Sequence, residues 1–442
     1  MRNQGRAAAV TQVSRRHVAI AGALLLALAA TACSSSSSSS TPTASKPVTI
    51  TYWSSSTQAE INWLDAHFNA SHKTIKVQGQ YIASADETTA KEVAALKSGT
   101  EPNVVIGQDP SALPLLAESG KVVDLSKPLA AETNALYPGI KSALFYQGHQ
   151  LGMALGGVGD FVLFYNKKDF AKAGISGPPA TWTQLEADAI KLSDPAKHHY
   201  GIYIPFGTDE WISYDWESLL WANGGQFLNS ADTKTAFDSP AGVQALTTWV
   251  DLVRKDHAAP TTSFAEAGSY DGAPAFSSDA VSMIIGGQWA VSEFTTAKSD
   301  FGVALVPAGT SGHSASNIGI GVATVFSHNA TADAAATTFV QWLAQPAQGA
   351  YLTSVSGGLP SAPAQLQQPA VQKEEASEPT YPTFATQLQT GGTRPTVPAY
   401  TAISLDLATE INAALTSNLS PAQALAKAAA EGNQAIASGS GS

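Results

Sequence analysis

Residues 48–53, Val-Thr-Ile-Thr-Tyr-Trp, are the stretch that decides the fold, because this run is β-branched and aromatic. Pro47 precedes it and the polar run 54–57 follows it, so the pattern predicts a strand with defined ends. Helical spacing of apolar side chains comes next, and a second short strand is expected at residues 75–77. Strand, helix and strand in this order favour an α/β arrangement with parallel pairing.

The same alternation continues along the chain. Apolar strands are expected at residues 103–107, 161–165, 280–285 and 302–306. Helical spacing predicts helices over residues 88–97, 113–118, 182–192, 212–222, 241–254, 331–344, 403–415 and 421–430. The fold class is therefore α/β, with sheets flanked by helices.

Three glycine-rich passages interrupt this pattern, at residues 152–159, 309–321 and 357–360. No long linker divides the chain, and no repeat of 20–50 residues is present. Two α/β lobes crossed several times by the chain would produce such a sequence. The glycines then serve either as hinges or as ordinary turns, and both readings remain open.

The first 33 residues have the pattern of an export signal. Arg15 and Arg16 precede an apolar run at 18–30, which is too short to span a bilayer, and small residues then lead to Cys33. The run resembles a twin-arginine signal followed by a bacterial lipobox. Seven serines at 34–40 have nothing to bury, so they predict a flexible tether. The alternative is a short hydrophobic helix that carries a chance cysteine.

Charge and cysteine content exclude several classes of protein. The chain has 442 residues and a net charge of −11. The four basic residues among the first 32 are all arginines, so residues 33–442 carry 20 basic and 35 acidic groups, a net charge of −15. This excess argues against nucleic-acid binding, which needs clustered Lys and Arg. A single cysteine excludes an internal disulfide framework.

No catalytic motif stands out. The chain lacks a phosphate-binding Gly-x-x-x-x-Gly-Lys-Ser/Thr loop, a dinucleotide fingerprint in the required context and a nucleophile elbow. Its histidines are not spaced as paired metal ligands. We therefore expect no catalytic residue, metal or cofactor, although a carboxylate pair for glycoside hydrolysis is not excluded.

Aromatic residues are the more informative feature. All nine tryptophans follow the signal, and Trp211, Tyr214 and Trp216 crowd into one polar stretch. Gly286-Gly287-Gln288-Trp289 places a large ring after two glycines that allow a ligand to approach the backbone. Aromatic faces stack on sugar rings, but core packing is the alternative for each ring. We assign Trp182, Trp249 and Trp342 to the core from their helical spacing.

Several short stretches, in order along the chain, resemble the family 1 extracellular solute-binding proteins, the lipid-anchored sugar receptors of bacterial ABC importers. The matching stretches are residues 102–105, 117–125, 164–170, 178–182, 221–225, 283–290 and 339–343. Together they cover nearly the whole body of the chain after residue 48.

The resemblance implies a periplasmic-binding-protein-like fold, with two lobes, a hinge of several crossings and a ligand in the cleft. The expected divisions are a signal peptide at 1–32, a lipidated cysteine and tether at 33–46, lobe 1 at 47–156 plus about 304–357, lobe 2 at 157–303 plus about 358–436, and a disordered tail at 437–442. It also implies ligand-binding roles for Trp289, Asp109, Tyr214, Trp211, Asp160, Arg394, Gly287, Gly358, Ser55 and Ser56. A structural ion pair is the alternative role for Arg394.

The expected function is capture of a mono- or oligosaccharide and its delivery to ABC permease subunits, by a monomer anchored outside the cytoplasmic membrane. An exported glycoside hydrolase is a second hypothesis, with Asp209 or Asp215 as nominal carboxylates. A receptor for a peptide, polyamine or osmolyte is the third, because aromatic rings with acids can cage a cation.

The export signal generates a first prediction. Processing should remove residues 1–32 and leave an acylated Cys33 at the new N-terminus, because the only cysteine directly follows small residues. Intact-mass measurement of protein extracted from membranes checks this. An unmodified cysteine, or cleavage at another position, would contradict it.

Overall fold

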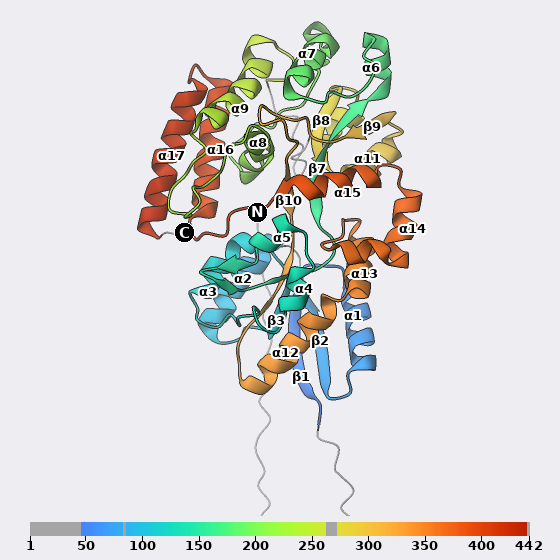
Figure 1. Cartoon of the computed structure of the whole chain (residues 1–442), viewed down its shortest axis with the longest axis vertical. Helices are drawn as coiled ribbons and strands as arrows, with labels where there is room; N and C mark the ends of the chain where they lie inside the picture. Colours follow the sequence, from blue (N-terminus) through green and yellow to red (C-terminus); the bar gives the residue numbers. More distant parts are fainter. Residues whose placement is uncertain (1–45, 83–84, 262–271, 440–442) are drawn as a thin grey trace, which may run out of the picture. The chain divides into compact units, whose positions relative to one another are not determined.

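The structure is a computed structural model that describes residues 46–82, 85–261 and 272–439. The expected signal peptide, Cys33 and the Ser-rich run lie outside the described residues. Strands and helices alternate along the described chain and form two sheets, so the predicted α/β class is confirmed (Figure 1). We call each sheet with its helices a lobe.

The first lobe contains a five-stranded sheet. Its strand β1 (Val48–Ser54) runs parallel to β2 (Ile75–Tyr81) on one side and to β3 (Val104–Gln108) on the other. Beyond β3, β11 (Val322–Val325) runs antiparallel to both of its neighbours, β3 and β6 (Met153–Ala154). The helices and hairpin that accompany this sheet are α1 (Gln58–Ser71), α2 (Ala85–Ser98), α3 (Leu113–Ala117), α4 (Ala130–Asn134), α5 (Pro138–Ser142), β4 (Phe145–Tyr146), β5 (His149–Gln150), α12 (Ala330–Leu343), α13 (Pro346–Ser356) and α14 (Pro369–Ser377).

The second lobe is organised around β7 (Gly159–Asn166), which is buried along most of its length. It pairs antiparallel with β8 (Met283–Gly287), β9 (Phe301–Ala304) and β10 (Ser316–Gly319), and β12 (Gly391–Gly392) pairs with β10. The helices around it are α6 (Lys167–Ala173), α7 (Trp182–Leu192), α8 (Glu210–Ala222), α9 (Pro240–Val250), α10 (Ala273–Ser277), α11 (Ala290–Ala297), α15 (Tyr381–Gln387), α16 (Tyr400–Thr416) and α17 (Pro421–Ser438).

The chain passes between the two sheets from β6 to β7, again from β10 to β11, and a third time between α13 and α15. The first and third crossings lie side by side, because Val158 and Leu359 form an antiparallel bridge. A Cβ atom on Gly358 would lie 2.7 Å from the backbone of Gly157. Glycine is therefore required where these two crossings touch.

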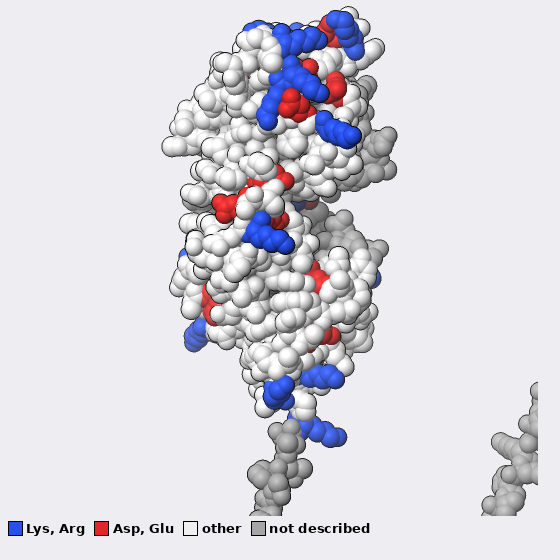
Figure 2. Space-filling model, turned by 90° about the vertical axis from the view of Figure 1, so that its right-hand side faces the viewer, with Lys and Arg blue, Asp and Glu red and all other residues white. Residues whose placement is uncertain are grey.

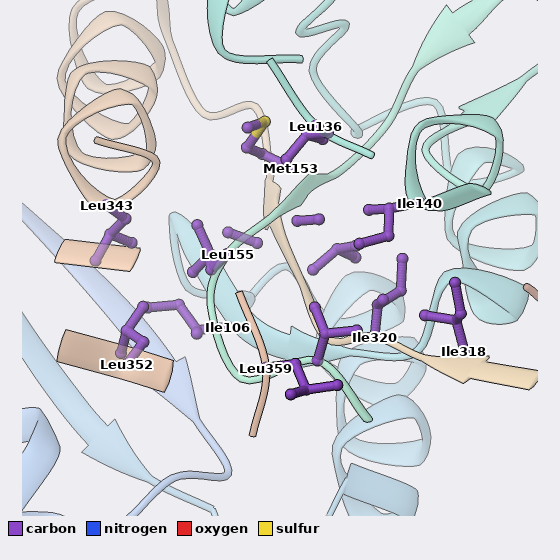
Figure 3. Close-up of a cluster of buried hydrophobic side chains, with 14 of the residues drawn as sticks. Ile106, Leu136, Ile140, Met153, Leu155, Ile318, Ile320, Leu343, Leu352 and Leu359 are labelled. Carbon is purple, nitrogen blue, oxygen red and sulfur yellow. The ribbon is translucent and has the colours of Figure 1, made fainter. Parts of the chain in front are cut away.

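One hydrophobic cluster continues through these crossings. It joins Ile106 of the first lobe to Ile320 and Leu359 of the crossings, and to Phe164 on one face of the second sheet. Figure 3 shows Ile320 and Leu359 beside residues of the first lobe. The other face of the second sheet, with Phe161, belongs to a separate cluster covered by α8, α9, α16 and α17.

The tryptophans assigned to the core behave as predicted, with one exception. Trp182 and Trp249 are buried, at 4% and 2% exposure. Trp342 is half-buried and packs at the margin of the first cluster, where its ring lies 5.4 Å from that of Phe68. Helical spacing therefore correctly placed Trp182 and Trp249 in the core, whereas Trp342 lies at its edge.

Two details differ from the sequence-based expectation. The glycine-rich passage 309–321 contains β10, and β11 follows it, so the chain returns to the first sheet near residue 320. We therefore propose a lobe boundary there in place of about 304, and the other boundaries remain predictions. Helix α17 continues to Ser438, so residues 437 and 438 are helical and not part of a disordered tail.

Charged side chains are sparse on the surface that Figure 2 shows, where basic groups form separate patches. Lys and Arg gather there at the end of the second lobe at which Figure 1 places α6. Within residues 46–82, 85–261 and 272–439, no helix has the length and apolar character needed to cross a membrane.

Candidate ligand-binding site

A cavity of about 400 Å³ lies where loops of the two lobes meet. Asp109 reaches it directly after β3, Trp289 reaches it at the start of α11, and Arg394 reaches it after β12. The other lining residues are Gly107, Gly157, Gly159, Gln288, Gly319, Ile320, Gly321, Ser356, Gly357 and Gly358. Because most of these are glycines, the ligand would meet backbone groups along much of the wall.

Trp289 forms an aromatic wall of this cavity. Its side chain is 49% exposed, although it is a large apolar group. A Cβ atom on Gly287 would lie 2.1 Å from the six-membered ring of the indole, and one on Gly159 would lie 3.3 Å away. The ring therefore lies flat against the backbone of β8, and any larger residue at position 287 would displace it. Gly287 was expected to contact the ligand, but it does not line the cavity, and its observed role is to give the Trp289 ring space against the strand.

Arg394 connects the two lobes through two carboxylates. Its Nη1 lies 3.2 Å from Oδ2 of Asp109 in the first lobe, and its Nε donates to Oε1 of Glu210 in the second lobe over 2.6 Å. Tyr400 donates to the same Glu210 oxygen over 2.8 Å. Burial alone would lower the pKa of Arg394, but the opposing charges, Asp109 first, raise it above its usual value. The Arg394 guanidinium therefore stays positively charged, and the carboxylates of Asp109 and Glu210 already compensate that charge.

Asp109 is held in position by its own loop. Its Oδ1 accepts hydrogen bonds from the backbone and the hydroxyl of Ser111, at 2.8 and 2.7 Å. This leaves Oδ2 for Arg394. The loop therefore fixes the carboxylate that faces the second lobe.

Two aromatic residues of α8, Tyr214 and Trp211, pack against residues that line the cavity. The ring of Tyr214 is 4% exposed, and the Arg394 guanidinium covers it at 4.1 Å. Such a ring offers no open face for a sugar, so Tyr214 holds Arg394 in place by a cation–π contact. Trp211 is half-buried and its ring centre lies 6.1 Å from that of Trp289, edge to face. Trp211 therefore packs against Trp289 but does not line the cavity.

Asp160, expected from the sequence to contact the ligand, lies away from the cavity lining. Successive side chains of a strand point to opposite faces, and Phe161 faces Trp211 and Trp289. The carboxyl of Asp160 consequently lies on the other face of β7, 1% exposed, with no hydrogen bond to either oxygen. Burial raises its pKa well above the usual range. Because Asp160 is buried and does not line the cavity, we leave it out of the proposed contacts.

The remaining expected residues lie close to the cavity with different roles. Gly358 lines it, on the third crossing. Ser55 follows β1, and its Oγ would lie 2.6 Å from a Cβ atom on Gly107. Ser55 therefore packs against Gly107, which lines the cavity, but does not line it itself. The backbone N–H of Ser56 donates to Oγ of Ser54 at 3.1 Å, and Ser56 does not line the cavity.

Two residues important to this geometry were not singled out from the sequence. Gln288 donates to the Val158 carbonyl at 3.1 Å and thereby ties the start of α11 to the first crossing. Glu210 belongs to the noted aromatic-rich stretch, but only the fold shows that it pairs with Arg394. Only two arginines, Arg254 and Arg394, follow residue 32, and this rarity favoured a specific role for Arg394 without identifying Glu210 as its partner.

A buried glutamate lies beneath Arg394. Glu217 of α8 is 0% exposed, and Asn317 of β10 donates to its Oε2 at 2.7 Å. Burial raises the pKa of Glu217 to about 8. The amide of Asn317 also donates to the Tyr214 carbonyl at 2.9 Å, so this pair fixes α8 to the second sheet under the site.

The carboxylates of the hydrolase hypothesis do not face the cavity. Asp209 caps α8 by accepting from the Trp211 backbone at 3.0 Å, and Asp215 is 6% exposed on the same helix. Neither lines the cavity. Within the described part of the chain, no group of three or more His, Cys, Asp or Glu residues is placed to hold a metal ion.

A Ser–His–Asp cluster elsewhere lacks the geometry of a hydrolase. His199 Nε2 lies 2.9 Å from Oγ of Ser282. The serine hydroxyl, however, donates to Asp169 at 2.9 Å, and Ser282 is 0% exposed. A catalytic serine must give its proton to the histidine and must reach its substrate. This cluster therefore links strands and helices of the second lobe.

Two α/β lobes, three crossings and a cavity lined from both lobes define the chain as a two-lobed solute-binding protein. The chain belongs to the bacterial extracellular solute-binding protein family, whose model matches residues 53–350. The resemblance given above is therefore confirmed. Members of this family are exported.

Similar proteins are binding proteins. The crystal structure of the cyclic alpha-maltosyl-1,6-maltose binding protein from Arthrobacter globiformis is 26% identical, with a TM-score of 0.79 over 88% of this chain and 99% of that chain. The substrate-binding protein Lmo0181 from Listeria monocytogenes, in complex with cycloalternan, shares the fold at 23% identity, with a TM-score of 0.72 over 89% and 100% of the two chains.

Among curated proteins, the sn-glycerol-3-phosphate-binding periplasmic protein UgpB of Rhizobium meliloti is 24% identical over 228 residues. The matched stretch is 48% of this chain and 52% of that protein. Across the curated relatives, the matched stretch covers between about a third and a half of their own length.

The buried Glu217 generates a prediction about pH. Because its native pKa is about 8, above an ordinary value of 4.5, the protonated form favours the folded state. Its contribution to stability should be complete below pH 4.5 and should be lost as the pH rises through 8. Denaturant unfolding from pH 5 to 9 should show that Glu217→Gln removes part of this loss, on the order of a few kcal/mol.

The exposed glutamate Glu375 provides the control, since Glu375→Gln should leave the pH profile unchanged. Burial also raises the pKa of Glu92 to about 8. Because Glu92 is present in both the wild type and Glu217→Gln, its contribution cancels, and the difference between their pH profiles reports Glu217 alone. Parallel profiles for the wild type and Glu217→Gln would contradict the prediction.

Proposed function

We propose that this protein is a receptor that binds a neutral carbohydrate between its lobes and delivers it to the permease of an ABC importer. The observation that carries the proposal is the half-exposed Trp289 ring, seated on Gly287 in a cavity lined from both lobes. The exposed indole leaves apolar surface in contact with water, which is unfavourable unless a ligand covers the ring. The C–H face of a sugar ring fits such an aromatic face. The carbohydrates named for two structural relatives support the same class of ligand.

The charges around the cavity favour a neutral ligand over a phosphate ester. Among the lining residues Arg394 is the only cation, and Asp109 and Glu210 already compensate it. A phosphate group such as that of sn-glycerol-3-phosphate would need cationic donors of its own. Hydroxyl groups need only neutral donors and acceptors, which exposed glycine backbone can supply.

Cationic ligands are disfavoured for a similar reason. A polyamine would need carboxylates that remain unpaired beside aromatic rings. Glu210 pairs with Arg394, Asp209 caps a helix, and Glu217 is buried. The acids of the aromatic-rich stretch therefore have other partners, and a saccharide receptor is the better proposal than a polyamine receptor.

Binding is proposed to involve no chemical step. The lining residues include one carboxylate, Asp109, which is bound to Ser111 and Arg394. Glycoside hydrolysis uses two carboxyl groups, one of which must hold a proton. The relatives compared above are likewise named as binding proteins.

The setting that we propose follows the family and the export signal. The acylated Cys33 would anchor a monomer to the outer face of the cytoplasmic membrane, and residues 34–46 would act as the tether. The partners would be permease subunits and a carbohydrate, with no nucleic acid and no cofactor. The three crossings would act as the hinge, since a ligand that touches both lobes binds the closed arrangement better.

Trp289 provides the direct test of recognition. Trp289→Ala should weaken saccharide binding by about 1–3 kcal/mol, because it removes the stacking surface, and should leave the fold intact. Trp182→Ala is the matched control, since this ring is buried and its loss should cost about 3–5 kcal/mol of stability. Calorimetric titration and melting curves of both variants separate the two roles. Equal affinities of wild type and Trp289→Ala would remove Trp289 from the site.

Closure is tested separately. Saturating sugar should reduce the radius of gyration measured by small-angle scattering, because the ligand draws the lobes together. The sugar should be recovered unchanged. An unchanged radius at saturation would argue against closure, and conversion of the sugar would favour the hydrolase hypothesis.

A further inference from the structure

The segment that follows β12 connects the two lobes at a place outside the three crossings. Residues 393–396, Thr-Arg-Pro-Thr, belong to the second lobe, because β12 pairs with β10 just before them and Val397 is buried in the second hydrophobic cluster just after them. Three of their four side chains nevertheless contact the first lobe. Contacts at this place determine how easily the lobes separate.

Two threonine hydroxyls of this segment donate to backbone carbonyls of the first lobe. Thr393 Oγ1 lies 3.3 Å from the carbonyl oxygen of Gly139, and Thr396 Oγ1 lies 3.2 Å from that of Ala143. The two acceptors lie in α5 and directly after it. A Cβ atom on Gly139 would lie 2.5 Å from the carbonyl oxygen of Gly391, so α5 approaches β12 more closely than a side chain at position 139 would allow.

The third contact is the ion pair between Arg394 and Asp109, and each partner is fixed within its own lobe. Ser111 holds Asp109 through two hydrogen bonds, and Glu210 and the Tyr214 ring hold Arg394. Separation of the lobes would therefore break the ion pair, because neither side chain is free to follow the other. The side chain of Asp109 is 37% exposed, so water and salt reach the pair.

The backbone of the segment is stiff. Pro395 lies within it and Pro398 follows closely, and each proline ring fixes the φ angle of its residue. Strand β12 ends at Gly392 and α16 begins at Tyr400, so the second lobe holds the segment at both ends. A stiff segment with two fixed ends cannot stretch, so its contacts with the first lobe must break when the lobes move apart.

Beside these contacts the lobes do not pack against each other. A cavity of about 510 Å³ borders the segment and is lined by Ala143 and Phe145 from the first lobe and by Trp221 and Asn229 from the second. The contacts of residues 393–396 therefore span a gap between the lobes. Resistance to separation at this place depends on the ion pair and the two hydrogen bonds.

We propose that residues 393–396 form an inter-lobe latch, which favours the closed arrangement of the lobes before any solute binds. The latch consists of the Asp109–Arg394 ion pair and the two threonine hydrogen bonds. Because Asp109 and Arg394 also line the cavity that contains Trp289, release of the latch and access to that cavity occur in one movement. A ligand that contacts both lobes then adds to an existing preference for closure.

Salt distinguishes the ion pair from the hydrogen bonds. The screening length falls from about 10 Å in 0.1 M salt to about 3 Å in 1 M salt, so high salt weakens a partly exposed ion pair more than bonds between neutral groups. Small-angle scattering of the whole protein without ligand should therefore give a larger radius of gyration in about 1 M than in about 0.1 M sodium chloride.

Substitutions in the latch should change this response in different ways. Asp109→Asn should already have the larger radius at low salt and should respond little to added salt. The double variant Thr393→Val/Thr396→Val should also be larger at low salt but should keep its response, because the ion pair remains. When the scattering is described as a mixture of closed and open lobes, each lost contact should lower the ratio of closed to open molecules about two- to tenfold.

Matched variants control for general effects of charge and hydroxyl loss. Asp251→Asn removes an ion pair with Lys255 that lies within the second lobe, at 3.1 Å. Thr416→Val removes a hydroxyl that donates to the Asn412 carbonyl of its own helix at 2.7 Å. Both variants should match the wild type at both salt concentrations, and melting curves check that each variant folds. If the double variant fails to fold, Asp109→Asn and its salt response decide the matter.

Every measurement is made without ligand, so the outcome is independent of the proposed function. Equal radii for the wild type and Asp109→Asn at both salt concentrations would overturn the latch and leave a sugar receptor. An increase in Asp251→Asn as large as that in Asp109→Asn would also overturn it, because the change would then follow from net charge. Failure of every sugar to bind would contradict the proposed function and leave the latch.

Discussion

Arg394 carries a buried positive charge at the junction of the two lobes, and the geometry of the proposed site depends on how that charge is compensated. A buried charge is costly unless carboxylates and hydrogen bonds replace water around it. Asp109 supplies one carboxylate from the first lobe, and Glu210 supplies the other from the second. Movement of one lobe against the other must therefore change the Asp109–Arg394 distance, so the ion pair is sensitive to the separation of the lobes.

The same compensation determines what the cavity can recognise. Since the guanidinium is already paired with Asp109 and Glu210 and rests on Tyr214, it has no uncompensated positive charge with which to attract an anion. In the proposed site, recognition would then rest on the Trp289 ring and on backbone groups that the lining glycines leave accessible. Such a wall distinguishes ligands by ring shape and by the direction of their hydroxyl groups, because neutral hydrogen bonds are directional.

Much of the fold was predictable from the sequence, because apolar periodicity reports which faces are buried. It located β1, β3 and β7, and it assigned Trp182 and Trp249 to the core. The strands β10 and β11 were missed because they lie within and directly after the glycine-rich passage 309–321, where the glycines favour turns over strands.

The site was less predictable, because it depends on which face of a strand or helix meets the other lobe. Asp160 and Phe161 are adjacent in sequence, yet only Phe161 faces the aromatic wall. Periodicity alone does not identify that face.

The hydrophobic cluster that runs through the crossings has a different consequence, which concerns the cooperativity of unfolding. Because Ile320 and Leu359 bury surface of both lobes in one cluster, neither lobe is an autonomous folding domain, and the body should melt in a single transition. Replacing one lobe with that of a relative would therefore require repacking the interior of the other lobe as well.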